Sequence, residues 1–309
     1  MNEKGRPTPK VSVIIVVYDM PHQALRTLES FALPYQREVS RQDYEIIVVE
    51  NRSDRLLGEA AATSVAANVR YFLRENEGQS PVPALIFGIG KARAPHLGLV
   101  IDGARMVTPR VLRYALDAFL ITPDAVVNVP GYHIGETEQH LNPSHDEAIE
   151  SRLLQRIDWR QDGYRLFTIS TFFRGRHHRG YLLPLMESNC LFFSRSALEA
   201  VGGVDERFDM PGGGMVNLDL YKELGERPGA ALFLLPGEGT FHQYHGGVTT
   251  RVDERREELL HSFREQYLQL RGKPYGFLMT KPRLLGAVTG WAMPMLEQSA
   301  AESMWMELQ

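Results

Sequence analysis

VSVIIVV at residues 11–17 is a run of β-branched apolar residues interrupted by a single serine. A strand covered on both faces of a parallel sheet has this composition, because neither of its faces meets water. Tyr18 and Asp19 follow directly, and Pro21 suits the first turn of a helix. Small or apolar side chains then recur at helical spacing, at Ala24, Leu25, Leu28, Phe31 and Ala32. The stretch therefore predicts a buried strand, a short polar loop and an amphipathic helix.

The same alternation continues along the chain. Further strands are expected at 44–49, 69–73, 97–101, 125–129, 190–194 and 231–235, and further helices at 82–92, 109–121, 216–226 and 251–271. This order predicts an α/β fold with a mostly parallel, doubly wound, Rossmann-like sheet and helices on both faces. Ligands of such sheets bind beyond the carboxyl ends of the strands. Residues 130–148 are polar, carry three histidines and are expected to form a loop.

Composition excludes several classes of protein. The 309 residues are 43% hydrophobic and 23% charged with a net charge of -4, so nothing indicates a nucleic-acid partner. The apolar stretch at 284–296 is too short to span a bilayer and is broken by Gly and Pro, so no transmembrane segment is expected. The single Cys190 excludes an internal disulfide. Together with a polar N-terminus this indicates a cytoplasmic protein.

The stretch LVIDGARMVTP at residues 99–109 places Asp102 directly after a buried run. An acid at a strand end suits a ribose or a metal ion. A divalent metal would call for a second carboxylate two residues later, but Ala104 and Arg105 stand there. The sequence alone leaves open whether a metal ligand has been lost or was never needed.

The loops after the first two strands carry an aromatic ring and several acceptors. Tyr18 and Asp19 lie in the first loop, and Glu50, Asn51, Ser53 and Asp54 lie in the second. A ring that stacks and oxygens that accept hydrogen bonds suit a nucleobase and its ribose. Asp19 and Asp54 are equally suited to cap helices. Asn76, in the third loop, offers either backbone N–H groups to a ligand or a simple turn.

Five motifs in this order resemble family 2 glycosyltransferases of the inverting GT-A type. They are VSVIIVVYD, YEIIVVENRSD, VRYFLRENEG, GLVIDGARMVTPRVL and GGVDERFDMPGGGMVNLDL, and the resemblance spans about residues 11–246. It implies a GT-A fold and glycan biosynthesis, in which a sugar moves with inversion from a nucleoside diphosphate to an acceptor hydroxyl. UDP is the commonest nucleotide in the family, so a UDP-sugar donor is expected. The acceptor would be a glycan, a lipid-linked sugar or a small molecule.

The resemblance also implies domain limits. A polar tail covers residues 1–10, and the GT-A catalytic domain covers 11–250. Its nucleotide-binding half is 11–130 and its sugar and acceptor half is 131–250. A helical C-terminal extension covers 251–309.

Site residues follow by matching motifs position by position. The nucleotide-binding positions are Val17, Tyr18, Asp19, Glu50, Asn51, Ser53, Asn76, Asp102, Gly103 and Arg105, with Glu50 where the family usually has Asp. The sugar and acceptor positions are Ser188, Asn189, Gly213, Gly214 and Asn217.

Two departures from the family pattern bear on the chemistry. Asp102 matches the first Asp of the family's Asp-x-Asp motif, whereas Ala104 replaces the second, metal-binding one. A bound Mn²⁺ or Mg²⁺ is therefore in doubt, yet a leaving diphosphate needs positive charge. Three substitutes are open: Arg105, the basic segment RGRHHRG at 174–180, or a metal held by Asp102 with His242 or His245.

The second departure concerns the general base. The family's Glu-Asp pair would fall on Gly214 and Met215, so both acids are missing. Asp219, one helical turn later, is the first substitute, and Glu187 is the second. Asp205 is a further candidate that suits a turn or cap better.

Missing acids are also expected in a catalytically silent homologue that serves as a nucleotide- or glycan-binding or scaffold module. A nucleotidyltransferase is disfavoured, because no glycine- and lysine-rich phosphate loop opens the chain. The retained segments SNC, PGGGMVNLDL and FHQYHGG favour a working enzyme, since a degenerate pocket would not need these polar groups and glycines.

Overall fold

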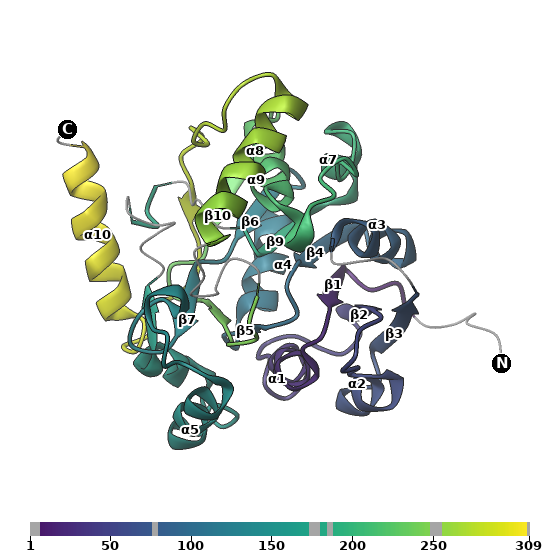
Figure 1. Cartoon of the computed structure of the whole chain (residues 1–309), viewed down its shortest axis with the longest axis vertical. Coiled ribbons are helices and arrows are strands. Elements are labelled where there is room, and N and C mark those ends of the chain that lie inside the picture. Colours follow the sequence, from purple (N-terminus) through teal and green to yellow (C-terminus); the bar gives the residue numbers. More distant parts are fainter. Residues whose placement is uncertain (1–6, 76–79, 173–179, 184–187, 248–254, 308–309) are drawn as a thin grey trace.

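The computed structural model describes residues 7–75, 80–172, 180–183, 188–247 and 255–307. Within them the main sheet has eight strands, in the order β12-β10-β6-β9-β4-β1-β2-β3 (Figure 1). Their bounds are β1 (Val11–Val17), β2 (Tyr44–Asn51), β3 (Val69–Arg74), β4 (His96–Val100), β6 (Ala125–Asn128), β9 (Cys190–Ser194), β10 (Ala231–Leu234) and β12 (Arg283–Leu284). All neighbours are parallel except β9, which runs antiparallel to β4 and β6. The predicted mostly parallel α/β sheet is confirmed.

Helices cover both faces of this sheet, as predicted. Val13 and Ile15 of β1 pack in one core with Leu28 of α1 (Pro21–Phe31), whereas Ile14 packs in another with Leu85 of α3 (Val82–Lys91). The first face also carries α2 (Glu59–Val65) and α4 (Val111–Ile121); the second carries α7 (Arg195–Ala200) and α8 (Val216–Glu226). Successive strand side chains point to opposite faces, so a continuous apolar run is needed to fill both cores.

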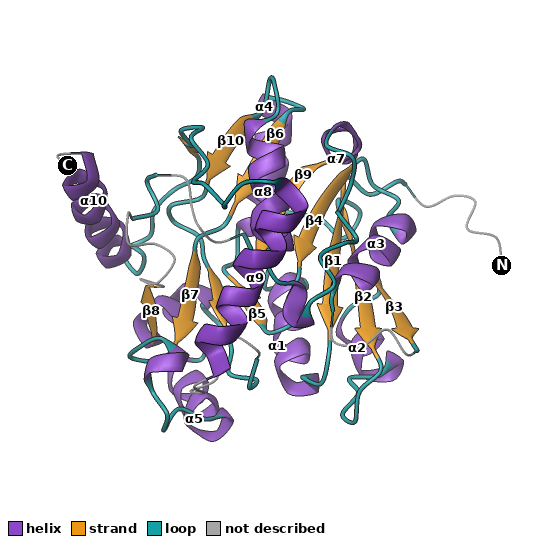
Figure 2. Ribbon diagram, turned by 45° about the horizontal axis from the view of Figure 1, so that its top comes forward, coloured by secondary structure: helices purple, strands orange, loops and turns teal. Residues whose placement is uncertain are grey.

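A second, four-stranded sheet lies beside the carboxyl ends of the main strands. It consists of β5 (Arg105–Val107), β11 (Thr240–His242), β7 (Gly131–Ile134) and β8 (Ser170–Phe172), in that order. Figure 2 shows β7 and β8 set apart from the β1–β3 side of the main sheet. These strands have at most four residues each, too few for their periodicity to be recognised in the sequence.

The prediction of a polar loop over residues 130–148 is wrong at both ends of that range. Its first part forms β7, in which all four residues are buried. Its last residues open α5 (Glu147–Ile157), whose N-cap Asp146 accepts a hydrogen bond from the Ile149 amide (2.7 Å). Short 3₁₀ turns occupy Gln139–Leu141, Gly163–Ile169 and Pro211–Gly213. The strand was hidden because a polar residue, His133, interrupts it.

The C-terminal region is helical, as predicted, with α9 (Arg255–Arg271) and α10 (Met293–Glu307) (Figures 1 and 2). Tyr267 of α9 is buried against Val82 and Phe208. Between the two helices, β12 adds a strand to the edge of the main sheet. The segment therefore packs on the rest of the fold, and its proposed boundary at residue 250 stays a prediction.

Candidate functional site

Asp102 lies in the turn between β4 and β5, where the two sheets meet. The strand register pairs Val17 of β1 with Glu50 of β2, and Ile15 with Val100 of β4, so these carboxyl ends share one edge. Gly103 fits closely against that edge: a Cβ atom there would lie 2.9 Å from the Val16 carbonyl oxygen. The Ala104 amide donates a hydrogen bond to Oδ1 of Asp102 (3.0 Å). The second carboxylate oxygen is left for other partners.

Two histidines of the second sheet and its following loop converge on that second oxygen. Nε2 of His242, at the end of β11, lies 2.9 Å from Oδ2 of Asp102. Nε2 of His245 lies 3.5 Å from the same oxygen and 3.0 Å from Nε2 of His242. Antiparallel pairing of β11 with β5 aligns His242 with Arg105 and so brings the histidine to the Asp102 turn. The convergence depends on a strand pairing that connects distant parts of the chain.

These three side chains fit a divalent cation. In the described part of the chain they form a group whose ligand atoms all lie within 4.8 Å of one another. Ligands about 2.1 Å from an ion and at right angles are separated by ~3 Å, which matches the observed spacing. Two imidazoles and one carboxylate are a donor set of transition-metal sites. The chain thus offers nitrogen ligands in place of the carboxylate missing at Ala104.

The electrostatics favour a neutral imidazole at His242 and an ionised carboxylate at Asp102. Burial, followed by the positive charge of Arg105, lowers the pKa of His242 to about 3, so this imidazole stays neutral. Burial would raise the pKa of Asp102, but the imidazoles of His245 and His242 more than offset it and hold that pKa well below its usual range. A neutral imidazole and an ionised carboxylate both present lone pairs.

Arg105 is the buried cation of the site. Its side chain is 6% exposed, and Nε lies 3.6 Å from Oδ2 of Asp102. As the first residue of β5 it is fixed by strand pairing instead of standing on a flexible loop. A permanently charged guanidinium here adds positive potential beside the predicted diphosphate position.

The first two strand-end loops bind each other. The Asp19 amide donates to Oγ of Ser53 (3.2 Å), and the Asp19 carboxylate pairs with Nε of Arg55 (3.2 Å). Asp19 adopts a left-handed backbone conformation with φ 56°. Arg55 also donates to the Asp19 carbonyl (2.7 Å). Asp19 therefore serves the loop-to-loop contact, and Tyr18 beside it stays half-buried.

Glu50 is fully buried and anchors its own loop. One carboxylate oxygen accepts from the Leu57 amide (2.8 Å), and the other accepts from the Gly58 amide (3.1 Å) and the Tyr71 hydroxyl (2.6 Å). Asn51 donates to the Ser80 carbonyl (3.3 Å). Both residues thus shape the loops at the strand ends, and their predicted contact with a nucleotide stays a prediction.

The predicted sugar and acceptor positions come together from two distant elements. Oγ of Ser188 donates to the Asn217 carbonyl (2.8 Å), and Nδ2 of Asn217 donates to Oδ1 of Asn189 (2.8 Å). Asn217 lies on α8. Directly before this helix, Gly213 and Gly214 both adopt positive φ, and a Cβ atom on Gly213 would lie 2.9 Å from Pro81. The glycine-rich turn is therefore needed to bring α8 against β9 and α3.

Comparisons with known proteins establish the family and the fold. The profile of Glycosyl transferase family 2 matches residues 12–202, more than half of the chain. The chain belongs to glycosyl transferase family 2. Its solved structural relatives include the mannosyltransferase PcManGT from Pyrobaculum calidifontis in complex with GDP-Man and Mn²⁺, with TM-score 0.53 and 15% identity over 97% of this chain and 72% of that one. Another is S. aureus TarS 1–349, with TM-score 0.49 and 12% identity over 85% of this chain and 72% of that one. No curated protein matches it.

At these identities the structural likeness concerns the fold, and the predicted GT-A architecture is confirmed. Membership of the family supports glycosyl transfer as the activity of this glycosyltransferase. Among the described residues, no helix is both long and apolar enough to cross a membrane.

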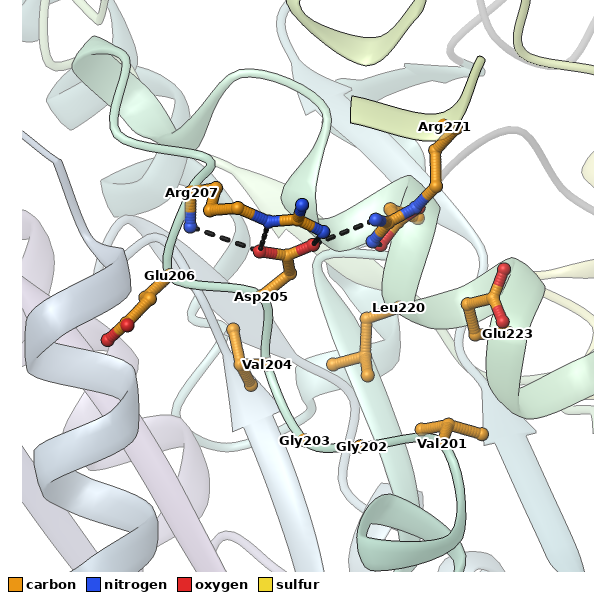
Figure 3. A pocket seen from close by; sticks show the side chains of 11 residues that line it. Val201, Gly202, Gly203, Val204, Asp205, Glu206, Arg207, Leu220, Glu223 and Arg271 are labelled. Atoms are coloured by element: carbon orange, nitrogen blue, oxygen red, sulfur yellow. Dashed lines mark hydrogen bonds and ion pairs between the residues drawn. The ribbon is translucent and has the colours of Figure 1, made fainter. Parts of the chain in front are cut away.

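Asp219, the first candidate base of this glycosyltransferase, is bound in an ion pair. Its two carboxylate oxygens accept from Nε and Nη2 of Arg271 at 2.7 and 2.5 Å. Arg271 also reaches Asp205 (2.8 Å), which binds Arg207 on its other side (Figure 3). The pair therefore joins α8 to α9. Both oxygens of the Asp219 carboxylate are bound to the Arg271 guanidinium and are not left to bind the hydroxyl of an acceptor substrate.

This ion-pair network lines a pocket of about 570 Å³ between the α7–α8 connection and α9. Figure 3 shows Gly202 and Gly203 at one end of the pocket and Glu223 on the helix beside it. Hydrogen bonds from Arg207 and one from Arg271 hold the pKa of Asp205 far below the ordinary range, which favours the structural role that its sequence context suggests.

Three sequence candidates of this glycosyltransferase lie outside the described residues: Asn76, Glu187 and the basic segment at 174–179. Four residues that contact the strand-end loops or the histidine segment were not predicted from the sequence: Arg55, Gln23, Gln139 and Glu150. Each acts on residues that are remote in the chain or belong to an unpredicted strand, so no spacing or motif pointed to them.

Proposed function

We propose that this glycosyltransferase moves a sugar from a nucleoside-diphosphate donor to an acceptor hydroxyl with inversion, and that Asp102, His242 and His245 hold a divalent cation. The observation that carries the proposal is the convergence of these three side chains at the carboxyl end of β4. The same edge of a doubly wound sheet is where ligands bind. The alternative is that Arg105 alone binds the diphosphate, without a cation. We favour it less, because it does not explain why two imidazoles lie beside the Asp102 carboxylate.

When bound, the cation neutralises charge on the donor diphosphate and on the leaving nucleoside diphosphate. The chain's own residues do the rest. Arg105 supplies fixed positive charge beside the same group. Tyr18 and Asp19 flank the nucleotide from the first loop, and Ser188, Asn189 and Asn217 offer polar atoms to the sugar or acceptor.

The reaction is a single displacement. The acceptor oxygen bonds to the anomeric carbon as the bond to the donor diphosphate breaks, and the acceptor proton passes to a carboxylate. We propose Glu187 for that carboxylate, because it adjoins Ser188 in sequence and because Arg271 occupies both oxygens of Asp219.

The donor is proposed to be a UDP-sugar, from the frequency of UDP in the family. The archaeal mannosyltransferase similar in fold was solved with GDP-Man and Mn²⁺, so a GDP-sugar is the second donor to test.

The test is turnover of α-linked UDP- and GDP-sugars with Mn²⁺ and panels of free sugars, glycans and lipid-linked sugars, followed by proton NMR of the product. A β-linked product establishes inversion, and loss of turnover in D102N ties it to this site. An α-linked product contradicts the single displacement. Nucleotide binding without any transfer across these panels would favour the silent binding module.

A further inference from the structure

The segment that carries both histidine ligands is held by hydrogen bonds from three other parts of the fold. Nε2 of Gln139 donates to the His242 carbonyl (3.1 Å), and the Gln243 amide donates to the Ala104 carbonyl (2.9 Å). Nε2 of Gln23, on α1, donates to the Tyr244 carbonyl (2.6 Å). A backbone with this many long-range partners has little freedom to rotate.

The amide of Tyr244, directly before His245, has the most unusual of these partners. It donates to Oε2 of Glu150 on α5 at 2.6 Å, and Glu150 is fully buried. Nη1 of Arg26 lies 3.5 Å from the other oxygen of Glu150. The carboxylate therefore connects the histidine segment to α5, a helix at the edge of the molecule (Figure 1).

A buried carboxylate is destabilising unless it is paired and hydrogen-bonded. Here the arginine lies at the outer limit of an ion pair, whereas the hydrogen bond to the Tyr244 amide is short. The close contact is thus with the histidine segment. Nε2 of His145 lies 3.9 Å from Oε2 of Glu150, beyond hydrogen-bond distance.

We propose that Glu150 is a positioning residue of the cation site: by holding the Tyr244 amide it fixes the backbone that aims His245 at Asp102. This inference rests on the proposed function, because it assigns Glu150 to the cation held by Asp102, His242 and His245. Groups that orient metal ligands change metal affinity by about 10–100-fold when removed. Gln23 and Gln139 support the same segment from its other sides.

The test is Mn²⁺ binding to the full chain by titration calorimetry, without nucleotide or turnover. E150A is expected to weaken the affinity by about 10–100-fold. E150Q keeps an acceptor oxygen for the Tyr244 amide, so its Mn²⁺ affinity is expected to fall less than that of E150A. It serves as the second variant if E150A does not fold.

Glu45 provides a matched control. It is also a buried carboxylate, accepts from a backbone amide (Arg93, 2.9 Å) and pairs with arginines, but it lies at the opposite end of the strands. E45A is expected to lower stability while leaving the Mn²⁺ affinity unchanged. Equal Mn²⁺ affinity in the wild type, E150A and E150Q would overturn the proposal.

Hydrogen exchange of the metal-free protein tests the contact between Glu150 and the Tyr244 amide separately from the cation site. Faster exchange of the Tyr244 amide in E150A but not in E45A supports the backbone contact independently of any cation. Unchanged exchange at Tyr244 overturns it. If the wild type binds no Mn²⁺, the cation site of the proposed function is wrong, while the exchange result still decides whether Glu150 orders the segment.

Discussion

Nε2 of His242 lies 2.9 Å from Oδ2 of Asp102: the histidine ends a strand of the second sheet, and the aspartate lies in the turn that connects the main sheet to it. The contact exists because β11 pairs with β5, the strand that immediately follows the Asp102 turn. A site built this way places nitrogen donors where the family motif would have its second carboxylate. The composition of this set of side chains therefore decides which ion the proposed site would prefer.

We expect this site to prefer Mn²⁺ or Co²⁺ over Mg²⁺. Mg²⁺ binds through carboxylates and water and has little affinity for imidazole, whereas two imidazoles and a carboxylate suit the later divalent metals. Titration calorimetry checks this, and H242A and H245A should each lower Mn²⁺ affinity by at least about 100-fold, more than loss of an orienting group. Equal affinities for Mg²⁺ and Mn²⁺ would contradict the histidine ligands.

Arg105 should contribute to donor binding through its charge. R105M is expected to weaken binding of the nucleoside diphosphate by about 1.5–3 kcal/mol, since hydrogen bonds to charged groups have this strength. R113M is the control, because Arg113 pairs with Asp117 on the exposed side of α4. Donor titrations of the two variants compare them directly. Identical affinities in both would remove Arg105 from the site.

The Asp219–Arg271 pair should stabilise the fold more than it assists catalysis. R271M leaves the buried Asp219 carboxylate without its guanidinium and is expected to lower the free energy of unfolding by about 2–4 kcal/mol. R207M, which removes an exposed partner of Asp205, should change it by less than about 1 kcal/mol. Urea unfolding measures both.

The same pair separates the two candidate bases. If Asp219 only joins α8 to α9, then D219N and R271M both lower stability and leave kcat similar below their melting temperatures. A large drop in kcat in D219N alone would return Asp219 to the role of general base.

Glu238 should make stability depend on pH. Burial raises its pKa from 4.5 to about 7, although Thr108, Tyr164 and the Arg110 amide donate to it. The folded state thus holds the proton to higher pH than the unfolded chain does. The stabilisation is complete below pH 4.5 and is lost as pH rises through about 7.

Relative to E238Q, the wild type should lose about 3 kcal/mol of unfolding free energy over that range. Urea unfolding of both proteins at intervals from pH 4.5 to 8 gives the difference. A wild-type curve parallel to that of E238Q would show that this carboxyl titrates normally in the fold.

The parts of the fold that were predictable have long, uniform patterns. Val11–Val17 was correctly bounded because every position is buried, and Val216–Glu226 because a glycine-rich turn precedes it. β5, β7 and β11 were not found, since three or four residues that include Arg105, His133 and His242 carry no periodic signal. Their stability comes from pairing with one another, which is a tertiary property.

The candidate site also has parts that could be predicted from the sequence and parts that could not. Asp102 and the histidines could be proposed as one group, because a motif placed the acid and chemistry suggested the imidazoles. The ion pair that holds Asp219 could not be foreseen, as its partner Arg271 lies on another helix. Glu150 was equally hidden, because its hydrogen bond to the histidine segment is made with a backbone amide, which every residue except proline possesses.

The most direct test of cation-assisted donor binding is the melting temperature with UDP, GDP, CDP or dTDP, each in Mn²⁺ and in EDTA, for the wild type and D102N. A ligand at a hundredfold excess over its dissociation constant stabilises the folded state by about 2.7 kcal/mol. We predict that one nucleotide raises the melting temperature of the wild type only with Mn²⁺, and that D102N shows no such rise. A rise that persists in EDTA would contradict the cation site and assign the diphosphate to Arg105.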